Sequence, residues 1–159
     1  MPIFRFNYTE LVNDKELNSS DYHLLSEARR ISEGAYAPYS NFKVGASVLL
    51  KNGEIVLGIN IENASYPVGI CAERSALASA ISQFPEEEIE AIAISYLAPK
   101  GENDKPAFPC GMCRQFISEC EDRNEKPIRL ILAAQNGKVI LLETSKNLLP
   151  FSFGGTDLG

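Results

Sequence analysis

The sequence predicts a three-layer α/β/α domain built around a five-stranded mixed β-sheet. Helix-like and strand-like segments alternate along the chain, which is typical of this class. The 159 residues suffice for one domain that buries roughly 70% of its unfolded surface. Residues 89–98 form a nearly unbroken apolar run of strand length, as expected for a buried central strand.

The N-terminal part divides into an extension and the start of the domain. Residues 1–18 show no clean period, so they are predicted to be an N-terminal extension to a domain spanning residues 19–159. Apolar residues at helical spacing then predict a helix. Ser19 or Ser20 is expected to cap this helix, and Gly34 to end it.

A β-hairpin follows the first helix. Residues 42–50 and 54–61 are strand-like, and an Asn-Gly pair between them is a strong hairpin turn signal. The next helix starts at Cys71 and ends before Pro85, and the third helix begins after Pro109. Together with the run at 89–98, the remaining predicted strands are residues 128–134 and 139–144.

Composition excludes several function classes. The net charge is −6 and the 15 Lys and Arg residues are scattered, whereas a nucleic-acid partner needs a basic face. No apolar run approaches the ~20 residues that cross a bilayer, and the start lacks a signal-peptide layout. We therefore expect a cytoplasmic protein without a membrane partner. Its four cysteines should then be ligands, catalysts or core residues rather than disulfides.

Three of the cysteines have the spacing of a zinc site. Cys110 and Cys113 are one helical turn apart, and Cys71 stands at the start of the preceding helix. Helix N-termini stabilise thiolates, so two converging helix starts could offer three sulfurs to one Zn²⁺. Cys120 lies about 10 Å further along its helix, beyond the reach of Zn–S bonds of about 2.3 Å. It is predicted to be a core residue.

Three protein ligands leave one tetrahedral position for water, as in catalytic zinc sites. The only histidine, His23, has no ligand-like neighbours and is not expected to bind the metal. Glu73, two residues after Cys71, is placed to move protons to and from that water. A ligand, one residue, a non-ligating Glu and a later P-C-x-x-C form the layout of zinc deaminases.

Three thiolates and Zn²⁺ sum to a negative charge, which a nearby cation should offset. Arg74 follows Glu73 and Arg114 follows Cys113, so either guanidinium could donate to the ligand sulfurs. The sequence favours Arg74 without deciding between them.

At these residues the chain resembles the cytidine deaminases, in particular their small three-cysteine type. The matching segments are YSNFKVGASVL, GINIENASYPVGICAERSAL, PCGMCRQ and LLPFSF, in this order between about Ala35 and Phe153. The resemblance implies a homotetramer that deaminates cytidine and 2'-deoxycytidine in pyrimidine salvage. It also implies that Cys71, Cys110 and Cys113 hold zinc and that Glu73 is the catalytic acid.

The resemblance further implies four substrate-binding residues. Asn60 and Glu62 would bind the ribose hydroxyl, and Phe42 would lie against the pyrimidine ring. Phe153 would reach into the site of a neighbouring subunit. Two features depart from the family pattern: Phe108 stands where Ser is usual, and the extension is additional.

Three other functions remain open at the level of sequence. A relative could act on another aminopyrimidine, although Asn60 and Glu62 argue against this. A structural zinc module would need a fourth protein ligand and would give Glu73 no role. A polynucleotide editor is disfavoured by the acidic balance.

Overall fold

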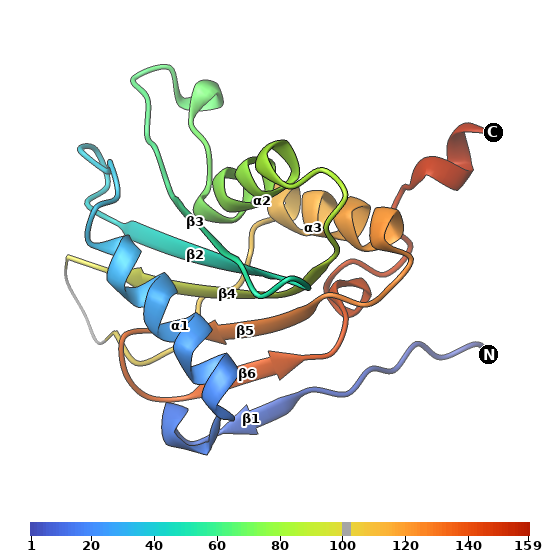
Figure 1. The fold of residues 1–159 in the computed structure, drawn as a ribbon, viewed down its shortest axis with the longest axis horizontal. Helices are drawn as coiled ribbons and strands as arrows, with labels where there is room; N and C mark the ends of the chain where they lie inside the picture. The colour runs from blue at the N-terminus through green and yellow to red at the C-terminus, as the bar shows by residue number, and fades with distance from the viewer. Residues whose placement is uncertain (100–102) are drawn as a thin grey trace.

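The computed structural model describes residues 1–99 and 103–159. In these residues six strands form a single sheet, and three α-helices cover its two faces (Figure 1). The elements, in chain order, are β1 (Thr9–Leu11), α1 (Ser19–Ser32), β2 (Lys43–Leu50), β3 (Ile55–Ile59), α2 (Ala72–Gln83), β4 (Ile89–Leu97), α3 (Gly111–Asn124), β5 (Arg129–Ala133) and β6 (Val139–Leu142). Short 3₁₀ turns occupy Asp14–Glu16 (η1), Tyr66–Val68 (η2), Ser145–Leu148 (η3) and Gly155–Leu158 (η4).

The sheet is mixed, as the sequence predicts, with the strand order β1-β6-β5-β4-β2-β3. Among the strands of the described residues, only β4 and β5 run parallel, and α3 lies in the crossover between them. The other neighbours are antiparallel. The central position of β4 explains its apolar sequence, because both of its faces are covered.

Two apolar cores confirm the three layers. Helix α1 packs on one face through Leu24 and Leu25, against Ala91, Ala93 and other residues of the central strands. Helices α2 and α3 cover the other face with a larger core. Figure 1 shows α2 and α3 side by side on that face, so their first turns open toward the same region.

Close packing fixes the helices that carry the cysteines. A Cβ at Gly58 of β3 would lie 2.3 Å from Ala76 N and 2.6 Å from Ala72 O, so only glycine lets α2 press this closely on the sheet. At the far end of α3, the buried Glu121 carboxylate accepts hydrogen bonds from Ile128 N (3.1 Å), from Ser145 N (2.8 Å) and Oγ (2.7 Å), and from Thr144 Oγ1. Close packing thus holds α2 against the sheet, and these hydrogen bonds hold the C-terminal end of α3.

The sheet has six strands rather than the five predicted. The additional strand, β1, comes from the N-terminal extension and pairs with β6 at the sheet edge. A three-residue strand leaves no detectable period, and its pairing is set by β6, about 130 residues away. The boundary at residue 18 itself stays a prediction.

The first helix begins one or two residues earlier than predicted, since Ser19 or Ser20 was the expected cap. Asn18 caps α1, because its side-chain oxygen accepts the Asp21 N–H at 2.9 Å. Asn is as effective a cap as Ser, and it simply stands one or two positions earlier. Within the described residues, no helix combines the length and apolarity needed to cross a bilayer.

Candidate metal centre and nucleoside cleft

The starts of α2 and α3 bring three cysteines together, as the sequence predicts. Cys71 and Cys110 occupy the N-cap positions of the two helices, and neither side chain caps its own helix. Cys113 follows one turn into α3 and is fully buried. The free N–H groups and the positive dipole ends of both helices therefore act on sulfurs rather than on capping oxygens.

The sulfur geometry fits a tetrahedral zinc ion. The three Sγ atoms all lie within 4.8 Å of one another. The Cys71–Cys110 separation is 3.9 Å and the Cys110–Cys113 separation is 3.5 Å. Tetrahedral ligation with Zn–S bonds of about 2.3 Å requires sulfurs about 3.8 Å apart. Among residues 1–99 and 103–159, no fourth metal-binding side chain joins this cluster.

The thiol pKa values shift in opposite directions. The pKa of Cys71 falls to about 5, chiefly through its interaction with the Cys113 thiol, and Cys110 and Arg74 add to the effect. The pKa of Cys113 rises, because the same interaction and burial favour its protonated form. The cluster therefore favours a negative charge on Cys71, and the thiolate is the form of cysteine that binds a metal.

Glu73 lies in the first turn of α2, beside the sulfurs, and lines the same cleft. Its side chain is only 5% exposed. Burial raises the pKa of this carboxyl, although its own backbone N–H partly opposes the shift. A carboxyl held in this way accepts a proton more readily than an exposed one, as suits a group that accepts and returns protons.

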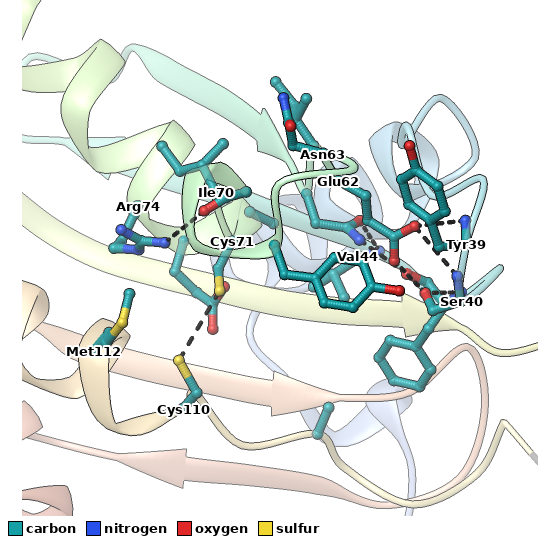
Figure 2. Close-up of a pocket in the computed structure, with 18 of the residues that line it drawn as sticks. Tyr39, Ser40, Val44, Glu62, Asn63, Ile70, Cys71, Arg74, Cys110 and Met112 are labelled. Atoms are coloured by element: carbon teal, nitrogen blue, oxygen red, sulfur yellow. Dashed lines mark hydrogen bonds between the residues drawn. The ribbon is translucent and has the colours of Figure 1, made fainter.

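The two candidate arginines have different partners. Arg74 lines the cleft, and its Nη2 donates to Gly69 O at 3.2 Å (Figure 2). Its buried Nε has no hydrogen-bond partner among the described residues. Arg114 instead donates to Pro109 O (2.8 Å) and Leu148 O (3.1 Å), which ties the start of α3 to the C-terminal segment. The geometry therefore favours Arg74 as the cation beside the thiolates.

A cleft of about 890 Å³ extends from the sulfurs to the segment after β3. Asn60 and Glu62 line it, and their side chains bind the start of β2 and the loop before it. Asn60 Oδ1 accepts Val44 N–H at 2.7 Å, and its Nδ2 donates to Phe42 O at 2.9 Å. Each side chain therefore shapes the cleft wall, and this arrangement agrees with the prediction that the two project to the same side.

Glu62 fastens the same loop (Figure 2). Its carboxylate accepts the Tyr39 N–H at 2.8 Å, the Ser40 N–H at 3.2 Å and the Ser40 hydroxyl. The Ser40 hydroxyl, followed by the Tyr39 and Ser40 N–H groups, lowers the pKa of Glu62. The sequence does not single out Ser40, although this residue lies within the motif YSNF; its role is evident only once Glu62 is placed beside it.

Some of the remaining residues singled out from the sequence line the cleft and others lie outside it. Phe42 lines the cleft, as does Phe108 near the sulfurs. Phe153 is 60% exposed and does not line the cleft of its own chain; Gln115 Nε2 holds its carbonyl at 2.8 Å. His23 is exposed on α1. Cys120 is only 3% exposed and lies in the core, as the sequence predicts.

Comparison with known proteins agrees with this site. Residues 18–125 match the family described as "Cytidine and deoxycytidylate deaminase zinc-binding region". A protein named cytidine deaminase from Halalkalibacterium halodurans is 40% identical over 135 residues, which cover 85% of this chain and 95% of that protein. A probable cytidine deaminase from Dictyostelium discoideum is 31% identical over 147 residues, or 92% of this chain and 90% of that protein.

Solved structures give the same result. The crystal structure of cytidine deaminase from Burkholderia pseudomallei superposes with a TM-score of 0.73 at 37% identity, over 83% of this chain and 98% of that one. The region matched by the family, residues 18–125, contains all three cysteines and Glu73. The chain therefore belongs to the cytidine and deoxycytidylate deaminase family, and its cysteine cluster, which could hold a metal ion, lies within the family's zinc-binding region.

Proposed function

We propose that this protein catalyses the zinc-dependent hydrolytic deamination of cytidine and 2'-deoxycytidine to uridine and 2'-deoxyuridine with release of ammonia, as a step of pyrimidine salvage. One observation carries the proposal: Cys71, Cys110 and Glu73 line a single cleft with Asn60 and Glu62, and the buried Cys113 Sγ lies within 4.8 Å of the other two sulfurs. Figure 2 shows Cys71 and Cys110 at one end of this cleft and Glu62 at the other. A nucleoside has a reacting base and a ribose separated in the same way.

Cys71, Cys110 and Cys113 would hold the zinc, and the bound ion would supply the Lewis acidity that makes water a nucleophile at neutral pH. Glu73 accepts one proton from the attacking water and delivers it to N3 as the C4–O bond forms. It then accepts the remaining proton from the hydroxyl on C4 and passes it to the amine, as the C4=O bond forms and the C4–N bond breaks. Its burial beside the sulfurs supports this role, because the carboxyl is shielded from bulk water.

The polar end of the cleft supports ribose binding by Asn60 and Glu62. A carboxylate offers about four acceptor sites, and the loop uses three of those on Glu62. Asn60 likewise retains one N–H and one lone pair after its two backbone hydrogen bonds. A ribose hydroxyl can therefore donate to Glu62 and accept from Asn60. Phe42 supplies an apolar ring for the flat pyrimidine.

We also propose that the protein is a homotetramer in which Phe153 completes a neighbour's cleft. Ligand pockets span about 300–1,000 Å³, so 890 Å³ is generous for a nucleoside. The rim is apolar and open, since Tyr66 is 76% exposed and Met112 is 58% exposed. Phe151 and Phe153 are exposed on the C-terminal segment. An aromatic side chain from a second copy would cover this rim.

We also propose a cytoplasmic location, which the chemistry of the site supports. The proposed site depends on reduced thiols, and all four cysteines are free. Reducing compartments keep thiols in this state.

The substrate proposal is tested by following absorbance with cytidine, 2'-deoxycytidine and cytosine on protein of measured zinc content. We expect both nucleosides to be converted and cytosine, which has no ribose for Asn60 and Glu62, to react at least tenfold more slowly. Equal rates for cytosine and cytidine would refute ribose binding by Asn60 and Glu62. The absence of turnover with both nucleosides would overturn the proposed reaction.

A further inference from the structure

Phe42 rests on a second aromatic ring that does not line the cleft. Its ring stacks on Tyr96 with centroids 4.9 Å apart and an angle of 14° between the planes. In the β2–β4 register Val44 stands opposite Tyr96, so Phe42, two residues before Val44, falls on the same face of the sheet. Tyr96 is 8% exposed, and Phe42 is 37% exposed where it meets the cleft.

The backbone of Phe42 is fixed by polar neighbours, but its ring is not. Phe42 N–H donates to Ser40 Oγ at 2.9 Å, and Phe42 O accepts from Asn60 Nδ2 at 2.9 Å. These hydrogen bonds place the Cα and leave the side-chain torsions free. The stack with Tyr96, with the two rings almost parallel, is a contact that can set the plane of the ring.

Tyr96 cannot shift to follow Phe42, because it is fixed independently. Its hydroxyl donates to Lys105 O at 2.9 Å, and its carbonyl accepts from Gln135 Nε2 at 3.0 Å. It also belongs to β4, in the middle of the sheet between β2 and β5 (Figure 1). Tyr96 is thus a rigid platform under a ring that would otherwise rotate.

We propose that Tyr96 is a positioning residue for nucleoside binding: it covers one face of Phe42 and so presents the other face, held at a fixed tilt, to the pyrimidine. This proposal rests on the proposed function, in which Phe42 lies against the base. Tyr96 does not touch the substrate and acts only through Phe42. Its effect is on binding and not on proton transfer at Glu73.

The test compares Tyr96→Leu, Tyr96→Met and Tyr96→Phe with Phe42→Leu. An aromatic pair contributes roughly 0.5–1.5 kcal/mol, so losing the flat platform should raise KM for cytidine about two- to tenfold. We expect this rise in the Leu and Met variants, with kcat within about twofold of the wild-type value and zinc content unchanged. Tyr96→Phe keeps the platform and loses only the hydrogen bond to Lys105, so its KM should stay near that of the wild type.

A double-mutant cycle separates this role from a general loss of structure. If Tyr96 acts through Phe42, the Phe42→Leu/Tyr96→Leu variant has a KM no higher than that of Phe42→Leu alone. Uridine dissociation constants from calorimetry provide the same comparison without turnover. The melting temperature of each variant identifies any that fail to fold, and two platform-deleting variants guard against that outcome.

The outcomes distinguish the two levels of the proposal. If Phe42→Leu raises KM and neither Tyr96→Leu nor Tyr96→Met does, the role of Tyr96 is wrong while the proposed function stands. The same conclusion follows if the two single effects multiply in the double variant. If Phe42→Leu leaves both KM and uridine affinity unchanged, the base contact itself is wrong, and the role of Tyr96 is refuted with it.

Discussion

Replacing Glu73 by Gln should remove catalysis without removing the metal. The amide has the size and shape of the carboxyl, so the buried position next to the sulfurs gains neither a cavity nor a clash. It cannot carry a proton between water and the leaving amine. Since Glu73 is not among the three clustered ligands, the zinc content should stay at the wild-type level.

The size of the loss follows from the other groups in the cleft. General acid–base catalysis contributes about 10²- to 10⁴-fold, or about 2.7–5.4 kcal/mol. Among the described residues that line the cleft, the only other carboxylate is Glu62, at the far end and held by Tyr39 and Ser40. None of these lining residues can replace Glu73, so we expect kcat for cytidine to fall by at least about 10³-fold.

The assay is steady-state absorbance on cytidine, paired with zinc analysis and a melting curve. Glu119→Gln is the matched control, because it makes the same chemical change at an exposed position of α3. It should leave kcat unchanged. A Glu73→Gln enzyme that keeps more than a tenth of the wild-type kcat would refute the proton-transfer role.

Three further predictions concern other parts of the molecule. Glu121→Gln should lower the melting temperature by about 6–12 °C, because the loss of one or two hydrogen bonds to a buried charge costs roughly 3 kcal/mol; unchanged melting would contradict this. Burial raises the pKa of Cys120 to about 11, so about one thiol in a thousand is ionised at pH 8. Iodoacetamide should therefore label Cys120 far more slowly in the folded protein than in the denatured protein, as followed by mass spectrometry. Equal labelling rates would be inconsistent with its burial. Phe153→Ala should lower kcat/KM for cytidine about two- to tenfold while Phe151→Ala does not, and light scattering that finds only monomers of the wild-type protein would exclude a role for Phe153 in a neighbour's cleft.

The sequence predicts the local parts of the cysteine cluster well, because their information lies in short spacings. Cys110 and Cys113 are one helical turn apart, and Glu73 is two residues from Cys71. Such short spacings keep these residues close together however the rest of the chain folds. The seven residues between Cys113 and Cys120 likewise exclude Cys120 from the site, because they correspond to about 10 Å along a helix.

Features that depend on distant partners were not predictable in the same way. The pairing of β1 with β6, the four donors around Glu121 and the Tyr96 platform under Phe42 all join segments far apart in the chain. Asn60 and Glu62 show the intermediate case. Their spacing predicts a common side, but only the fold shows that they also fasten the loop before β2.

The central claim, a catalytic zinc held by three sulfurs of this chain, is tested most directly by exchanging one cysteine at a time. Cys110→Ser removes a ligand at an exposed position, whereas Cys120→Ser makes the same change at a buried position outside the cluster. We predict about one zinc per chain and full cytidine turnover in the wild-type protein, and loss of both in Cys110→Ser. Cys120→Ser should keep both. Zinc retained at the wild-type level in Cys110→Ser, or lost from a folded Cys120→Ser, would contradict the account.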